Sequence, residues 1–367
     1  MQRHLHDCIR RKDLAGGRRL VSELLLLKQR NEEDYPLLSA HLIRLLALCG
    51  ALDEADRLFH ALQSHPSTWR AIISAHSKFG HSSTTLSLFA HMLHCNVEPC
   101  VHTFVAALKA CSVSSSAEKG ILMHAHIVEN GFEYNPYLSS TLIDMYCKCG
   151  RLEDAQSVFE DLPEKNVFSW TSIICGHSHL RQGYVALQFY TQMQQKGIQP
   201  NYVTFVCVLK ACSSISSSDM GRVCHCQIVE INHEVMMGFD AIGSSLVDMY
   251  VKSGRLKDAQ WVFNAIADKT LVTWTALITG YAQAGYDEED KVFYLFRQMQ
   301  HEGIEACQVA FVSVLMACSN LHALHQGKLI HTQIIVSPCE RDVYVANALV
   351  NMYVKCGSLQ EARQIFD

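Results

Sequence analysis

The chain has 367 residues, of which 49% are hydrophobic and 18% charged, a balance typical of folded proteins and unlike that of disordered chains. This length exceeds what one hydrophobic core usually serves, so we expect either several domains or an array of repeats. No apolar run approaches the ~18 residues of a membrane-spanning helix. The formal net charge of −5 excludes a strongly basic protein, so any binding of a polyanion must depend on local geometry.

Three short sequences recur along the chain in a fixed order. The tryptophans of the first are 101 and 104 residues apart, and the tyrosines of the second are 104 and 103 residues apart. The recurring residues are Trp69, Trp170 and Trp274, then Tyr146, Tyr250 and Tyr353, and lastly Cys111, Cys212 and Cys318. Three kinds of unit therefore alternate, and complete units of 31 to 38 residues fall in the range of helix-turn-helix repeats.

Apolar residues within a unit follow the period of a helix. Around Tyr146 the sequence predicts one helix before Gly150 and a second helix after it. In the unit of Trp170, we expect the first helix from about Phe168, the second from about Gly183, and its end at Lys196-Gly197. A helix pair cannot bury its apolar face alone, so the pairs must stack on one another.

The expected fold is all-α, a superhelical solenoid of about eleven tandem helix-turn-helix repeats with one concave face. One repeat array should cover residues 1–367. In chain order its units are 1–35, 36–66, 67–100, 101–135, 136–166, 167–201, 202–239, 240–270, 271–307, 308–342 and the incomplete 343–367. The last unit stops within its second helix, and the first lacks residues ahead of its first helix, so we expect the sequence to be cut at both ends.

The words SWTSII, FVCVLKACS and LVDMYVKSGRLKDA, in this recurring order, resemble the pentatricopeptide repeat proteins of land plants. The resemblance covers essentially the whole chain and is to the class that alternates long, standard and short motifs. It implies a right-handed superhelix in mitochondria or chloroplasts that reads single-stranded RNA at about one base per repeat. Such proteins commonly recognise sites of cytidine-to-uridine RNA editing, and many carry a C-terminal deaminase-like domain.

A deaminase of this kind needs a zinc-ligand His followed two residues later by Glu, and then a C-x-x-C pair. None of the twenty histidines has Glu at that position, and no two cysteines have that spacing. No phosphate-binding glycine loop or G-x-S-x-G turn is present either. We therefore expect no enzyme activity, no cofactor and no small-molecule substrate, and any editing deaminase or other editing factor would act in trans.

The resemblance further implies that base choice lies with the fifth and the last residue of a motif. The candidate base-reading residues are Ser140 with Asn166, Thr171 with Asn201, Ser244 with Thr270, and Thr275 and Asn347, whose partners depart from the pattern or are missing. The first two combinations resemble adenine-reading pairs, and Asn347 suggests a pyrimidine. Thr270 is not a familiar second member, Cys307 departs from the expected Asn or Asp, and Arg70 with Cys100 departs altogether.

Each of these roles has a structural alternative. Asn166, Asn201 and Thr270 immediately precede expected helices, where such side chains cap free N–H groups without any ligand. The second residues of four motifs could sandwich bases or could pack between repeats. These four residues are Tyr137, Phe168, Val272 and Tyr344.

Lysines and metal-binding residue types also recur. Lys148, Lys252 and Lys355 could follow an RNA backbone, or could complement the dipole at the end of a helix. The i,i+2 spacing of Cys147 and Cys149 places them on nearly opposite faces of a helix. His124, His225 and His331 each follow a glycine by four residues, which indicates packing at a repeated position, so we expect no metal site.

The alternative to RNA binding is a protein–protein scaffold of the tetratricopeptide kind, whose concave face would hold a peptide. A basic stripe on the concave face would favour RNA, whereas an acidic or apolar groove would favour the scaffold.

Overall fold

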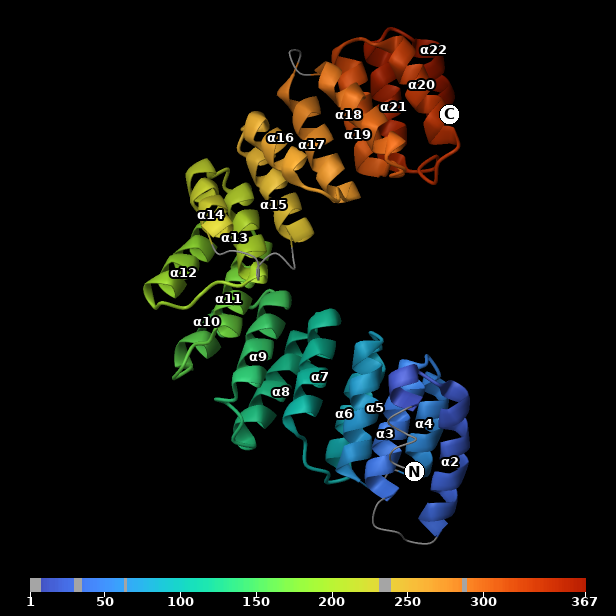
Figure 1. Cartoon of the computed structure of the whole chain (residues 1–367), viewed down its shortest axis with the longest axis vertical. Helices are drawn as coiled ribbons and strands as arrows, with labels where there is room; N and C mark the ends of the chain where they lie inside the picture. The colour runs from blue at the N-terminus through green and yellow to red at the C-terminus, as the bar shows by residue number, and fades with distance from the viewer. Residues whose placement is uncertain (1–7, 30–34, 63–64, 231–238, 286–288) are drawn as a thin grey trace. The chain divides into compact units, whose positions relative to one another are not determined.

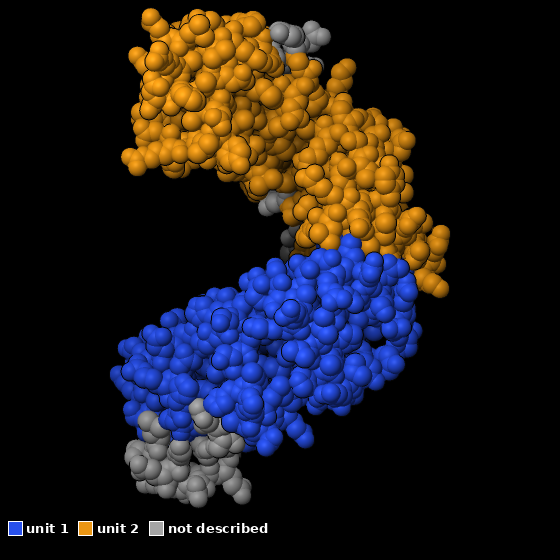
Figure 2. All heavy atoms as spheres, turned by 180° about the vertical axis from the view of Figure 1, so that it is seen from behind, with its two compact units in different colours: residues 1–176 blue, residues 177–367 orange. Residues whose placement is uncertain are grey.

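The computed structural model describes residues 8–29, 35–62, 65–230, 239–285 and 289–367, which form two compact units, residues 1–176 and 177–367 (Figure 2). Over the described residues the regular secondary structure is helical, without a strand, which confirms the all-α prediction. Within this part of the chain, every helix is too short or too polar to cross a membrane. The two units are described one at a time.

Unit 1 is built from helices of 10 to 16 residues (Figure 1). They are α2 (Leu14–Gln29), α3 (Tyr35–Leu48), α4 (Leu52–Ala61), α5 (Pro66–Lys78), α6 (Ser82–His94), α7 (Val101–Val113), α8 (Ala117–Glu129), α9 (Pro136–Lys148), α10 (Leu152–Asp161) and the first part of α11 (Val167–His179).

Unit 2 continues the same arrangement of helix pairs (Figure 1). Its helices after α11 are α12 (Gly183–Gln195), α13 (Tyr202–Ser214), α14 (Ser218–Glu230), α15 (Phe239–Lys252), α16 (Leu256–Ala265), α17 (Leu271–Ala284), α18 (Glu289–His301), α19 (Gln308–Asn320), α20 (Leu324–Ile335), α21 (Val343–Lys355) and α22 (Leu359–Phe366).

Each unit is a stack of helix pairs. The first helices pack on one another in the series α3, α5, α7, α9 in unit 1 and α13, α15, α17, α19, α21 in unit 2. In most pairs the second helix packs against the first helix of its own pair, and it often also contacts the first helix of the next pair, as α8 contacts α7 and α9. The prediction of tandem helix-turn-helix repeats is confirmed within each unit.

The lengths of the second helices repeat with a period of three. The helices α4, α10 and α16 have 10 residues each. The pairs of second helices between them, α6 and α8, then α12 and α14, have 13 residues each. The three kinds of unit in the sequence therefore correspond to a regular alternation of one short and two longer helix pairs.

The turn inside the short pairs explains where their first helices end. Gly150 has φ of 75°, a left-handed conformation that glycine adopts without steric cost. Its N–H donates to the carbonyl of Cys147 (3.1 Å), and the next N–H, that of Arg151, donates to Tyr146 (2.9 Å). This is the Schellman arrangement, which satisfies carbonyls at the end of α9. Gly254 repeats the geometry after α15, with φ of 71°.

A tryptophan joins each short pair to the pair that follows it. Trp170 of α11 meets Phe159 of α10 edge to face, with ring centroids 4.7 Å apart. Trp274 of α17 meets Phe263 of α16 at the same separation. Both tryptophans are nearly fully buried. An edge-to-face pair adds about 0.5–1.5 kcal/mol to the area that it buries, so this recurring contact fixes the spacing of neighbouring repeats.

A second recurring contact joins each short pair to the pair before it. The Nδ1 atom of His124 on α8 lies 2.9 Å from the Tyr146 hydroxyl on α9. One turn earlier on α8, a Cβ added to Gly120 would lie 2.4 Å from the sulfur of Met145, so only glycine fits there without a shift. The same arrangement joins α14 to α15 and α20 to α21, through His225 and His331.

Candidate nucleic-acid interface

Large flat or branched side chains stand exposed at the start of several first helices. Tyr137 on α9, Phe168 on α11, Val272 on α17 and Tyr344 on α21 are between 61% and 74% exposed. These are the residues for which the sequence left open base stacking or packing between repeats. Because most of each residue faces solvent, its side chain is accessible to a stacked base.

The asparagines that precede the first helices act as helix caps. Asn166 Oδ1 accepts hydrogen bonds from the N–H groups of Phe168 (2.9 Å) and Ser169 (3.0 Å) at the start of α11. Asn201 Oδ1 accepts from the N–H group of Thr204 (2.9 Å) on α13. Only the oxygen is used in the cap of Asn166, whose amide Nδ2 has no partner among the described residues. Capping therefore leaves the two amide protons for a ligand.

In one predicted pair, the fifth and the last residue lie side by side. The hydroxyl oxygens of Ser244 on α15 and Thr270 before α17 are 3.4 Å apart. Thr273 on α17 lies between them, 2.8 Å from Ser244 and 2.9 Å from Thr270. Thr273 is not among the residues predicted from the sequence, although its place in the first turn after a capping Thr is a signal that identifies it. Stacking of α15 on α17 thus joins two residues that are 26 positions apart.

Other predicted base-reading residues differ in how much they expose. Thr171 on α11 is 7% exposed, and it interacts with other residues of the protein. Ser140 and Thr275 are half-buried and donate their hydroxyl protons to backbone carbonyls one turn earlier, at 3.0 Å and 2.8 Å. Their oxygens remain acceptors. Asn347 on α21 is exposed.

Two of the three recurring lysines are paired with carboxylates on their own helix. Lys148 lies 2.8 Å from Asp144, and Lys252 lies 2.8 Å from Asp248. Lys355 is exposed at the end of α21, and the position four residues before it is Asn351. All three lysines end a helix, as the dipole interpretation requires. The charge that Lys148 and Lys252 could offer to a phosphate is largely compensated.

The recurring histidines have roles in packing. Burial lowers the pKa of His124, His225 and His331, and each Nδ1 faces a tyrosine hydroxyl at 2.9 Å. The thiols of Cys147 and Cys149 face different backbone carbonyls, at 3.9 Å in each case. Over the described ranges, no three His, Cys, Asp or Glu side chains gather as a metal site would require.

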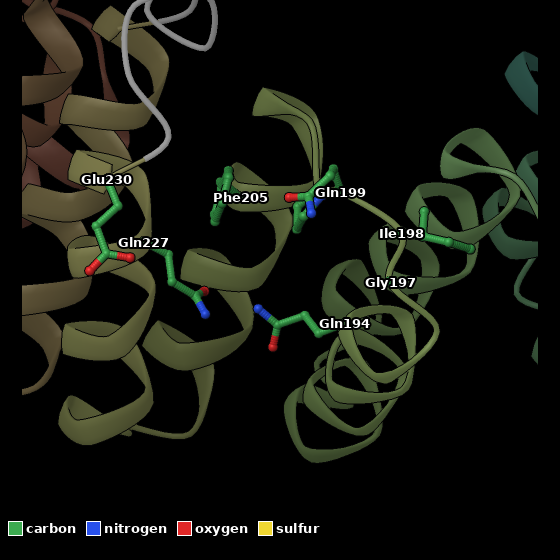
Figure 3. Close-up of a pocket in the computed structure, with 8 residues that line it drawn as sticks. Gln194, Gly197, Ile198, Gln199, Phe205, Gln227 and Glu230 are labelled. Atoms are coloured by element: carbon green, nitrogen blue, oxygen red, sulfur yellow. The ribbon is translucent and has the colours of Figure 1, made fainter.

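Unit 2 also contains a small pocket of about 250 Å³ beside α12, α13 and α14 (Figure 3). The amides of Gln194 and Gln227 point toward one another across it. The Tyr190 hydroxyl donates to Gln227 (2.6 Å) and accepts from Gln194 (3.2 Å), and burial raises the pKa of this tyrosine. These polar groups join α12 to α14, and the carboxylate of Glu230 in the lining is unfavourable for an anion.

The geometry defines a class of protein, a tandem helix-pair repeat protein whose first helices carry small polar side chains and exposed aromatic or branched ones. Family models described as PPR repeat or PPR repeat family match residues 67–97, 130–163, 165–214, 244–269, 272–304 and 344–367. The chain belongs to the pentatricopeptide repeat family.

Relatives from Arabidopsis thaliana match along most of the chain. A chloroplastic pentatricopeptide repeat-containing protein is 31% identical over 364 residues, which are 99% of this chain and 58% of the relative. A mitochondrial one is 31% identical over 318 residues, which are 86% of this chain and 30% of the relative. The chain thus spans between about a third and somewhat over half of the length of these relatives.

Solved structures agree in fold. The chain is similar to the crystal structure of the maize pentatricopeptide repeat protein PPR10 in complex with an 18-nt psaJ RNA element, with a TM-score of 0.72 and 17% identity. The match covers 90% of this chain and 49% of that chain.

Proposed function

We propose that this protein binds single-stranded RNA in a sequence-dependent manner through the first helices of its repeats. The observation that carries the proposal is the convergence of Ser244 and Thr270, the fifth and last residues of one motif, at 3.4 Å. Ser244 is buried and Thr270 is exposed, so the Thr270 hydroxyl, held beside Ser244, would offer the donor or acceptor to the edge of one base. The exposed Val272 beside them, and Tyr137 and Phe168 in unit 1, offer surfaces on which bases stack.

We further propose that the repeats form a single array of the class that alternates long, standard and short motifs. The period of three in the lengths of the second helices supports this assignment. The function proposed for the array is to recognise sites of RNA processing or cytidine-to-uridine editing in a chloroplast or mitochondrion, as the names of the relatives suggest for the compartment. Catalysis would come from a deaminase or other editing factor in trans.

The test is selection from a randomised single-stranded RNA pool by the whole chain. Ser140 and Asn166 both lie in unit 1, and the resemblance assigns them to adenine. We expect wild-type protein to enrich one sequence motif, and a Ser140→Ala/Asn166→Ala variant to lose the preference at one position that is adenine for the wild type. Ser157→Ala is the matched control, because this serine is exposed on the second helix of the same repeat.

Absence of enrichment by a folded protein would contradict the proposal and favour the peptide-binding scaffold. Equal relaxation in the Ser157→Ala variant would show that the preference depends on stability of the repeat and does not depend on the two paired residues.

A further inference from the structure

A groove of about 830 Å³ crosses the first helices of three consecutive repeats in unit 1. It lies on α3, α5 and α7, which pack side by side (Figure 1). Its lining includes four basic residues and no carboxylate; the four are Arg44, Arg70, Lys78 and Lys109. The protein as a whole has a net charge of −5, so this groove is a local concentration of positive charge.

The helical period explains why these side chains share one surface. Arg70 and Lys78 are eight residues apart on α5, with Ser74 between them, and residues four apart lie on the same face of a helix. On α7, His102 and Lys109 are two turns apart in the same way. Because α5 packs between α3 and α7, the charged faces of the three helices adjoin.

The four cations are not neutralised by the protein. Arg44, Arg70, Lys78 and Lys109 are exposed, and none has an ion-pair partner among the described residues. Later repeats keep only part of this charge. Asp144 stands where α3 has Arg44, and it pairs with Lys148, whereas Lys210 of α13 stands where α7 has Lys109. The combination of Arg44 and Arg70 is therefore specific to the first repeats, and the charge of the groove remains available to a ligand.

The chemistry of the groove suits a phosphodiester backbone better than it suits base selection. Arg70 replaces the Thr found at the same place in α11 and α17, and Cys100 replaces the capping Asn. Guanidinium groups bind phosphate oxygens through two donors at once. Alanines such as Ala71 and Ala106 contribute small side chains to the lining, and Phe79, 45% exposed, offers a stacking surface.

We propose that this groove binds the sugar-phosphate backbone of a single RNA strand without selecting its bases, and so holds the strand on the array. The inference deepens the proposed RNA binding and rests on it. It assigns affinity to unit 1 repeats whose paired residues do not fit base reading, and leaves selection to the repeats with Ser, Thr and Asn.

The experiment compares two triple variants of the whole chain with equal loss of charge. The groove variant is Arg44→Gln/Arg70→Gln/Lys109→Gln. The control variant is Arg19→Gln/Arg57→Gln/Lys119→Gln, which removes two arginines and a lysine from exposed places on the second helices α2, α4 and α8. Binding of fluorescent oligouridylate and of a mixed-sequence RNA strand is measured by anisotropy over a series of salt concentrations.

We expect the groove variant to bind both strands on the order of tenfold more weakly at low salt, and its slope of log affinity against log salt to be shallower by about 2. The control variant should keep a slope close to that of wild type. Equal salt slopes for the two variants would contradict the proposed backbone groove, as would a loss of affinity confined to one of the two RNA strands. If wild type binds both strands with equal affinity and the groove variant still binds more weakly, the proposed backbone groove is supported and the proposed base reading is contradicted.

Discussion

We expect the stability of the protein to depend on pH through three half-buried histidines on second helices. Burial lowers the pKa of His124, His225 and His331 below the ordinary value of 6.5. Between the folded and unfolded pKa values the unfolded chain binds more protons, so stability is fully present above about pH 6.5 and is lost as the pH falls through the folded pKa values. We expect the melting temperature to fall between about pH 7.5 and pH 5.5.

The variant His124→Gln/His225→Gln/His331→Gln isolates this effect, since glutamine can still accept a hydrogen bond from each tyrosine. Its loss of melting temperature on acidification should be smaller than that of wild type. An identical loss in the two proteins would refute the assignment to these three residues.

At Gly221 on α14 there is no room for a Cβ unless the side chain of Met249 shifts. A Cβ there would lie 2.3 Å from the sulfur of Met249, which is completely buried. We expect Gly221→Ala to lower the free energy of unfolding of unit 2 by about 1–3 kcal/mol, measured by denaturant unfolding, because overpacking forces side chains from their preferred rotamers. In a Met249→Ala background the same change should cost less, and strictly additive effects of the two changes would contradict this explanation.

At the scale of an element, the start of α19 is a place where one substitution should add stability. Cys307 occupies the N-cap without a side-chain hydrogen bond, whereas Asn201 in the same place before α13 accepts one. We expect Cys307→Asn to raise the free energy of unfolding by about 0.5–2 kcal/mol, by satisfying a free N–H group of the first turn. Calorimetry measures the change. Cys226→Asn, at an exposed site within α14, is the control and should leave stability nearly unchanged.

The elements themselves could be predicted well from the sequence, because their ends carry local signals. The first helix expected from about Phe168 begins at Val167, and the second, expected from Gly183, begins there and ends at Gln195, before Lys196-Gly197. Contacts between elements could not be predicted in this way. The sequence gives no distance between Ser244 and Thr273, and whether Arg44 and Arg70 share a groove depends on how α3 stacks on α5.

Among the charged residues, too, contacts within one helix could be predicted from the sequence, whereas contacts between helices could not. Pairing of Lys148 with Asp144 follows from a spacing of four residues, so it was open to prediction from the sequence. The cations of the basic groove are 26 and 39 residues apart, from Arg44 to Arg70 and from Arg70 to Lys109, and only comparison of successive first helices could have found them.

At the scale of the whole molecule, a stack of repeats should respond locally to local damage. Within each unit a repeat contacts mainly its neighbours, so stability is approximately a sum of repeat and interface terms.

The substitution Gly221→Ala weakens the contact between α14 and α15. We expect hydrogen exchange, followed by mass spectrometry, to become faster in α13 to α16, and to remain unchanged in α3 to α8 of unit 1. In a chain that unfolds as one cooperative body, the same substitution would accelerate exchange in the most protected helices of both units by the same factor. Gly120→Ala, at the equivalent contact between α8 and α9, tests the converse, since it should accelerate exchange in α7 to α10 and spare α17 to α22.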